Sequence, residues 1–163
     1  MSEPDAPRRR WRAELAEAQL SGLAAALAEV APDSYVIHLR GELGAGKTTF
    51  ARAFVRALLP GTRVKSPSFA LVEPYALPAG RSLYHVDLYR ISDPSELEAL
   101  GVRELAAPGS GLLVEWPERA RGAVPAPDLD LLLEHRIERR LLTLDARSPA
   151  GADWLQRVAR RSS

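Results

Sequence analysis

Residues 41–48 read Gly-Glu-Leu-Gly-Ala-Gly-Lys-Thr, which matches the phosphate-binding pattern G-x-x-x-x-G-K-T in full. The glycines allow the backbone to curl until successive N–H groups point at phosphate oxygens. Lys47 adds a charge that reaches the β- and γ-phosphates, and the Thr48 hydroxyl can bind Mg²⁺. The following helix directs its positive N-terminal end at the same oxygens. The segment therefore predicts a nucleotide site that uses Mg²⁺.

The residues on both sides of this loop fit the prediction. Residues 35–39 (Tyr-Val-Ile-His-Leu) form a short apolar run that is typical of a buried strand. Residues 48–59 contain no Gly or Pro and place apolar side chains at helical spacing, and Pro60-Gly61 ends the helix. A strand, a glycine-rich loop and a helix in this order are the context that the motif requires.

The whole chain is typical of a soluble globular domain. It has 163 residues, of which 46% are hydrophobic and 26% charged, with a net charge of +1 and no cysteine. This balance gives no general attraction to nucleic acid or membrane surfaces. The lack of cysteine excludes disulfides, cysteine-ligated zinc and a thiol nucleophile, and it suits the reducing cytoplasm. No apolar run is long enough to cross a membrane.

The remaining elements predict an α/β fold in three layers, with a mostly parallel central sheet flanked by helices. We expect residues 1–10 to be disordered and residues 11–163 to form a single domain. Helices are expected at 11–30, from Asp93 to about residue 100, and at 153–161. Further strands are expected at 70–75, 83–88 and 112–115, and at 129–134 and 140–144 as a possible hairpin.

Two acids follow apolar runs, as a site for Mg²⁺ and water requires. Glu115 ends the run 112–115 in the manner of a Walker B acid, and Asp87 ends the run 83–87. Either acid could instead cap a turn or pair with an arginine. His85 could serve as a base, although a histidine in an apolar strand is more often a packed sheet residue. Trp116 could stack on a base or a partner, or could belong to the core.

Ser66 and Ser68 bracket Pro67 in a loop that we expect near the nucleotide. Their hydroxyls could contact the γ-phosphate or its attacking water, as switch loops do. An ordinary turn is the other interpretation.

Four segments occur in one order: 41–50, 66–75 (Ser-Pro-Ser-Phe-Ala-Leu-Val-Glu-Pro-Tyr), 84–90 (Tyr-His-Val-Asp-Leu-Tyr-Arg) and 114–119 (Val-Glu-Trp-Pro-Glu-Arg). Together they closely resemble the TsaE (YjeE) family of small bacterial P-loop ATPases, over roughly residues 15–145. The first motif is common to many ATPases, whereas the second and third at this spacing are far more specific.

The resemblance implies a cytoplasmic, Mg²⁺-dependent ATP hydrolase with low activity alone. Such proteins support the TsaD–TsaB transferase, which makes threonylcarbamoyladenosine at position 37 of tRNAs that read ANN codons. Hydrolysis is thought to reset that complex, so contact with tRNA would be indirect. The resemblance implies no membrane partner, and we expect the chain alone to be a monomer or a weak oligomer.

Carried over to this sequence, the resemblance assigns catalytic roles to Lys47, Asp87 and Glu115, with Thr48 and Glu115 as Mg²⁺ ligands. The residues expected to contact ATP or ADP are Glu42, Leu43, Gly44, Ala45, Gly46, Lys47, Thr48, Thr49, Ser68 and Arg140. Three departures are visible. The family often has a threonine in its first helix near the nucleotide, and residues 11–30 contain none. Ser68 stands where the family usually has threonine, and Arg139-Arg140 occupies the place of a Gly-Arg pair.

Two other functions remain open. A small-molecule kinase would need an arginine-rich lid, for which Arg103, Arg119 and Arg121 are the candidates. A nucleotide-gated binding module would use ATP to order the 66–75 loop as a docking surface, without essential hydrolysis.

Overall fold

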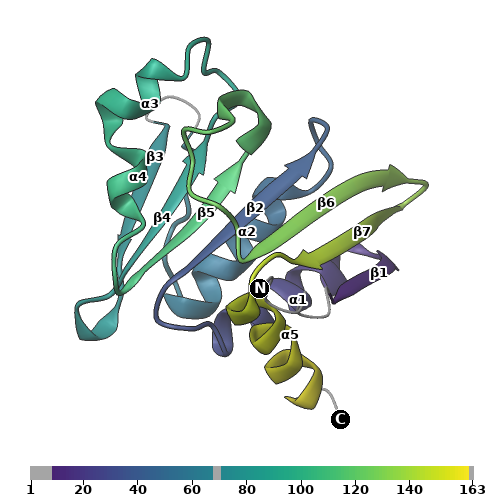
Figure 1. Cartoon of the computed structure of the whole chain (residues 1–163). Coiled ribbons are helices and arrows are strands. Elements are labelled where there is room, and N and C mark those ends of the chain that lie inside the picture. Colours follow the sequence, from purple (N-terminus) through teal and green to yellow (C-terminus); the bar gives the residue numbers. More distant parts are fainter. Residues whose placement is uncertain (1–8, 68–70, 162–163) are drawn as a thin grey trace, which may run out of the picture.

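A mixed sheet of seven strands forms the centre of the protein (Figure 1). The computed structural model describes residues 9–67 and 71–161. The strands are β1 (Arg10–Leu15), β2 (Tyr35–Gly41), β3 (Val72–Ala76), β4 (Ser82–Asp87), β5 (Ser110–Glu115), β6 (Leu129–Arg136) and β7 (Arg139–Ala146). The helices are α1 (Glu17–Glu29), α2 (Lys47–Leu58), α3 (Ser95–Leu100), α4 (Val102–Leu105) and α5 (Pro149–Arg161), with 3-10 turns η1 (Pro78–Gly80) and η2 (Pro117–Ala120).

The strand order is β1-β7-β6-β2-β5-β4-β3. The four inner strands β6, β2, β5 and β4 are parallel, whereas β3, β7 and β1 are added at the two edges in antiparallel pairs. This arrangement confirms the predicted α/β class with a parallel centre. The predicted hairpin is also confirmed, since β6 and β7 pair in antiparallel register.

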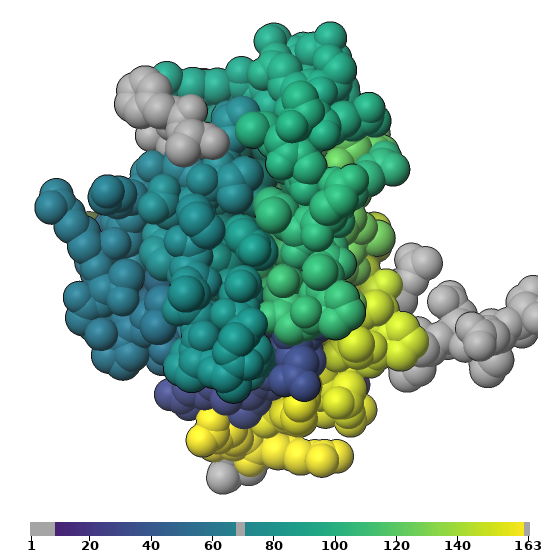
Figure 2. Space-filling view, turned by 90° about the vertical axis from the view of Figure 1, so that its left-hand side faces the viewer, coloured from purple at the N-terminus to yellow at the C-terminus, as the bar shows by residue number. Residues whose placement is uncertain are grey.

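Helices cover both faces of the sheet and produce three layers (Figure 1). On one face α1, α2 and α5 pack over a core that includes Leu27, Phe54 and Trp154. On the other face α3, α4 and η2 cover a smaller core that includes Leu97 and Val102. Figure 2 shows the side of the molecule on which the α3–α4 segment (teal to green) lies above and α5 (yellow) lies below.

The inner strands are apolar because both of their faces are covered. Leu112, Leu113 and Val114 of β5 are all fully buried, although neighbouring side chains in a strand point to opposite faces. On the α1–α2–α5 face, Tyr35 of β2 packs between Phe54 and Trp154, with ring centroids 5.7 and 4.9 Å away. The Trp154 indole donates a hydrogen bond of 2.9 Å to the Leu27 carbonyl, which ties α5 to α1.

The predicted helix at 11–30 is wrong in its first turns, because residues 10–15 form strand β1 and the helix begins at Glu17. This segment alternates in character. Leu15 belongs to the core, whereas Arg10 points outward and makes a salt bridge of 2.8 Å with Asp145 of β7. A period of two and an available edge on β7 outweigh the helix propensity of the alanines. Arg10 is the first residue of β1, and residues 1–8 of the segment expected to be disordered lie outside the described residues.

Helix α5 begins at Pro149, four residues before the predicted start at Asp153. The Ser148 hydroxyl accepts a hydrogen bond of 2.9 Å from the Gly151 N–H, as a helix-capping serine does. A serine before a proline is the signal that marks this start. Two hydrogen bonds precede α3, which begins at Ser95: Asp93 accepts from the Ser95 N–H at 2.9 Å, and Glu96 accepts from the Asp93 N–H at 3.3 Å.

Within the described part of the chain, none of the helices has the length and apolar character needed to cross a bilayer.

Two glycines in helices give a matched test of this packing. A Cβ on Gly151 of α5 would overlap the Asp128 carbonyl, whereas a Cβ on Gly22 of α1 meets no atom within 4 Å. We expect Gly151→Ala to lower the free energy of unfolding by about 1–3 kcal/mol through overpacking. Gly22→Ala should raise it by about 0.5–1 kcal/mol through helix propensity. Urea unfolding measures both, and a gain in stability for Gly151→Ala would contradict the close approach of α5 to Asp128.

Candidate functional site

The parallel inner strands bring their carboxyl ends to one edge of the sheet. In the sheet register Glu115 of β5 lies beside Leu39 of β2 and beside Asp87 of β4. The glycine-rich loop, residues 41–46, leaves β2 at the same edge and leads directly into α2. Strand-end acids and the loop therefore meet because of sheet topology, as is general for ligand sites in open parallel sheets.

Two glycines of the loop occupy positions that other residues could not fill easily. Gly41 has a φ of 145°, and a Cβ there would overlap the Leu133 carbonyl of β6. Gly46 has a φ of 113°, and its Cβ would lie 3.0 Å from a Leu20 methyl group of α1. The loop is thus held between β6 and α1 at a distance that only glycine allows.

The N-terminus of α2 is open to an anion. Gly46 provides no side-chain cap, and the first turn of the helix contains no acidic residue. The N–H groups of this turn and the helix dipole therefore point into the space above the loop, which is the arrangement that binds phosphate in many proteins.

Lys47 lies folded back against the loop, with only 4% of its surface exposed. Its ammonium donates to the carbonyls of Gly41 and Glu42, the second at 2.8 Å, and sits 4.3 Å from the centroid of the Trp116 ring. Burial lowers the pKa of Lys47, and the negative charges of Glu115, Glu118 and Asp87 oppose that shift.

Glu115 is buried, with 2% of its surface exposed, and each of its oxygens has a partner. Oε2 lies 2.6 Å from Nε2 of His85 on β4, and Oε1 accepts a hydrogen bond of 3.3 Å from the Thr48 hydroxyl of α2. The hydrogen bonds offset part of the cost of removing a carboxylate from water. They also place an acid beside the hydroxyl that the motif marks as a metal ligand.

Asp87 ends β4 and accepts a hydrogen bond of 3.0 Å from the Tyr89 N–H. Burial raises the pKa of Asp87, the Tyr89 hydrogen bond opposes the rise, and the charge of Glu115 adds to it. A partly buried carboxylate with a raised pKa at the edge of a cleft is suited to hold or accept a proton.

These groups line a cavity of about 620 Å³, which we call the nucleotide cavity. Of the residues predicted from the sequence, it is lined by Leu43, Gly44, Gly46, Lys47, Thr48, Thr49, Ser66, Asp87, Glu115, Trp116 and Arg140. Arg140 also donates to the Gly44 carbonyl at 3.3 Å, which fixes the β6–β7 hairpin against the loop.

Two predicted nucleotide contacts, Glu42 and Ala45, are not among the described residues that line the cavity. Glu42 faces a different cavity, and Ala45 is fully buried beneath the loop. Side chains at these positions have no access to the nucleotide cavity, although main-chain N–H groups of the loop remain part of the motif. Ser68 lies outside the described residues.

Several cavity residues were not predicted from the sequence. They are Glu17 and Leu20 of α1, Tyr89 and Arg90 after β4, and Glu138 and Arg139 at the β6–β7 turn. Nothing in the sequence marks Leu20 as a cavity residue, because its pattern is that of a core residue in an amphipathic helix. Tyr89 and Arg90 could have been predicted, since they end the 84–90 motif.

The donor set fits a magnesium ion that arrives with a nucleotide. Mg²⁺ binds hard oxygens at about 2.1 Å in octahedral geometry, so neighbouring ligands lie about 3 Å apart, and it keeps several waters besides substrate phosphates. The oxygens of Thr48 and Glu115, 3.3 Å apart, match two such positions. The described residues contain no cluster of three or more His, Cys, Asp or Glu that would hold a metal without a nucleotide.

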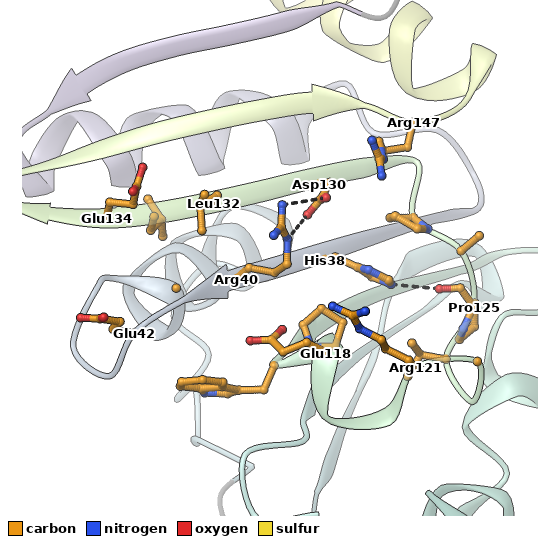
Figure 3. Close-up of a pocket in the computed structure, with 18 of the residues that line it drawn as sticks. His38, Arg40, Glu42, Glu118, Arg121, Pro125, Asp130, Leu132, Glu134 and Arg147 are labelled. Atoms are coloured by element: carbon orange, nitrogen blue, oxygen red, sulfur yellow. Dashed lines mark hydrogen bonds and ion pairs between the residues drawn. The ribbon is translucent and has the colours of Figure 1, made fainter.

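A larger cavity of about 960 Å³ lies on the other face of β2 and β6 (Figure 3). Arg40 donates two hydrogen bonds to Asp130, at 2.8 and 3.0 Å, and His38 Nε2 lies 2.9 Å from the Pro125 carbonyl. Burial lowers the pKa of His38. The described lining of this cavity contains neither the α2 N-terminus nor the acids at the ends of β4 and β5, so it lacks the groups that the phosphate-binding motif requires.

The arginines considered as a kinase lid are not clustered at the nucleotide cavity, although Arg119 lies beside two residues that line it. Arg103 donates to the Gly122 carbonyl, Arg121 lines the larger cavity, and Arg119 stacks 5.3 and 5.5 Å from the Tyr89 and Trp116 rings. Since none of the three is among the described residues that line the nucleotide cavity, the structure gives the kinase hypothesis no support.

The glycine-rich loop between a central parallel strand and a helix, together with the acid at the end of the adjacent strand, defines a P-loop fold. The family model for "Threonylcarbamoyl adenosine biosynthesis protein TsaE" matches residues 15–142. The chain therefore belongs to the TsaE family, whose members take part in tRNA threonylcarbamoyladenosine biosynthesis.

Individual relatives agree with this assignment. The tRNA threonylcarbamoyladenosine biosynthesis protein TsaE of Haemophilus influenzae is 39% identical over 116 residues, which are 71% of this chain and 73% of the relative. That of Aquifex aeolicus is 39% identical over 121 residues, 73% and 85% of the two chains. The crystal structure of YdiB from Bacillus subtilis superimposes with a TM-score of 0.73 at 26% identity, covering 96% and 97% of the two chains.

The raised pKa of Asp87 predicts a pH-dependent stability. Because the folded protein binds this proton more tightly than the unfolded chain, Asp87 in its protonated form favours folding. That contribution is complete below the ordinary aspartate pKa of about 3.9 and is lost as pH rises through the higher folded value. We expect Asp87→Asn to remove this loss, so that the mutant gains stability relative to wild type with rising pH. Urea unfolding over a pH series measures the difference, and a difference that stays constant with pH would contradict the raised pKa.

Proposed function

We propose that this protein is a Mg²⁺-dependent ATPase that supports the TsaD–TsaB transferase in the threonylcarbamoyladenosine modification of tRNA. The observation that carries the proposal is the meeting of Lys47, Thr48 and Glu115 at the nucleotide cavity. Lys47 and Thr48 begin α2 directly after the glycine-rich loop, and Glu115 ends β5. Together they are the parts that a P-loop protein needs to bind and cleave a nucleoside triphosphate.

In this proposal the loop N–H groups and Lys47 bind the β- and γ-phosphates of ATP. Lys47 exchanges its present bonds to the Gly41 and Glu42 carbonyls for phosphate oxygens. Thr48 and Glu115 hold the magnesium ion, which would neutralise the phosphate charge that develops during cleavage. Asp87 orients the attacking water and accepts its proton, a role that suits a carboxylate whose pKa is raised by burial. Arg140 contacts the nucleotide from the β6–β7 hairpin.

The pathway is supported by the relatives, which carry the name tRNA threonylcarbamoyladenosine biosynthesis protein TsaE. The protein would act in the cytoplasm on the transferase rather than on tRNA itself. With a net charge of +1, the chain has no overall positive field to attract tRNA.

Nucleotide binding is tested at Lys47. We expect Lys47→Ala to weaken binding of Mg²⁺–ADP and a Mg²⁺–ATP analogue by about 10- to 100-fold, because a hydrogen bond from a charged group contributes about 1.5–3 kcal/mol. Isothermal titration calorimetry measures the affinity. Arg52→Ala is the matched control, since Arg52 is an exposed cation on the same helix that does not line the cavity. Equal affinities for the three proteins would exclude the nucleotide cavity as the binding site.

Hydrolysis is tested at Glu115. We expect Glu115→Ala to keep its association with the TsaD–TsaB pair but to lose support of tRNA modification, because the metal would lack its acidic ligand. Pull-down measures the association, and mass spectrometry of digested tRNA measures the modified nucleoside. Full modification by this variant would instead indicate a nucleotide-gated binding module. Transfer of the ATP γ-phosphate to a metabolite in wild-type reactions would indicate a kinase.

A further inference from the structure

His85 is a buried histidine. Among the described residues its side chain has one hydrogen-bond partner, the carboxylate of Glu115. The ring lies on β4 with no exposed surface, and its Nε2 is 2.6 Å from Oε2 of Glu115. A carboxylate that binds a metal ion is ionised and can only accept hydrogen bonds, so in the metal-binding state Nε2 of His85 is the donor. The same bond leaves the other oxygen of Glu115, Oε1, directed at Thr48.

The second ring nitrogen of His85, Nδ1, shows which contact makes a histidine useful at this position. Nδ1 of His85 is buried and has no hydrogen-bond partner among the described residues. A buried polar atom without a partner costs folding free energy, so no contact on the Nδ1 side of the ring favours histidine over an apolar side chain. The packing of β4 therefore does not require histidine, whereas the bond from Nε2 to Glu115 does.

We propose that His85 is a positioning residue that fixes the carboxylate of Glu115 in the orientation that binds the nucleotide-associated metal ion; this inference rests on the proposed function. Glutamate has three side-chain torsions, and the nearby charge of Lys47 attracts its carboxylate. The His85 bond holds Oε2 on the β4 side and keeps Oε1 beside the Thr48 hydroxyl. Hydrogen bonds to a metal-binding carboxylate commonly serve this purpose.

The position of His85 fits a positioning role and excludes a direct catalytic one. His85 is not one of the residues that line the nucleotide cavity, and its surface is closed to solvent. Its Nε2 is already engaged with Glu115, so the ring has no route to a substrate or to an attacking water. The effect of His85 is therefore expected in the affinity for the metal and not in the affinity for the nucleotide alone.

The experiment measures these two affinities separately. Manganese serves as the probe: free Mn²⁺ is followed by electron paramagnetic resonance while it is titrated into the protein–ADP complex. Binding of ADP without metal, in the presence of EDTA, is measured by calorimetry. We expect His85→Leu to weaken Mn²⁺ binding about 10- to 100-fold, the usual effect of losing such a supporting group, with ADP binding in EDTA unchanged.

Conservative variants exclude a merely structural effect. The amide nitrogen of glutamine can reach the position of Nε2, whereas that of asparagine corresponds to Nδ1, so His85→Gln should retain Mn²⁺ affinity and His85→Asn should lose it. If His85→Leu fails to fold, the comparison of the glutamine and asparagine variants still tests the positioning role. His38→Leu is the matched control, because His38 lies on β2, on the other side of β5, and bonds to Pro125 instead of Glu115.

Wild-type Mn²⁺ affinity in His85→Leu, or equal losses in the glutamine and asparagine variants, would overturn the positioning role. A wild-type protein that binds neither ADP nor Mn²⁺ would overturn the proposed function itself, and the two failures are thus distinguishable.

Discussion

The parallel register between β2 and β5 is the constraint on which the site depends. It places Glu115 beside Leu39, and the Trp116 N–H continues the pairing with a hydrogen bond of 3.2 Å to the Leu39 carbonyl. The glycine-rich loop starts two residues later, at Gly41. A shift of one residue in this register would turn Glu115 to the opposite face of the sheet, away from Thr48. Gly111 makes such a shift unfavourable, because it is the residue of β5 beside Tyr35 and any Cβ at that place would overlap the Tyr35 ring.

The second feature of the site is the nearly complete burial of two opposite charges, those of Lys47 and Glu115, at the nucleotide cavity. Lys47 is held by loop carbonyls and by the face of Trp116, and Glu115 is held by His85 and Thr48. Trp116 adopts a left-handed backbone conformation with a φ of 59°, which is uncommon for a residue with a side chain. It lines both cavities, so it forms part of the wall between the proposed nucleotide position and the opposite face of the sheet.

Local signals predicted much of this structure. The loop, its flanking strand and helix, the β6–β7 hairpin and the strand-end position of Glu115 all follow from patterns within a few residues. Strand β1 could not be predicted in the same way, because its alternation competes with alanine-rich helix propensity and only the free edge of β7 decides the outcome. The role of Leu20 against Gly46 also lacked a local signal, since it depends on the packing of α1 over α2.

The sequence by itself determined the chemistry: a glycine-rich loop that must curl, a lysine and a threonine at its end, and acids that follow apolar strands. These features are local, and the physics of a short segment is enough to recognise them. Tertiary structure decided which acid lies against Thr48 and that His85 donates to it, because these contacts join residues 30 and 67 positions apart. Long-range contacts of this kind depend on strand order and register, which are set by the burial of the whole sheet.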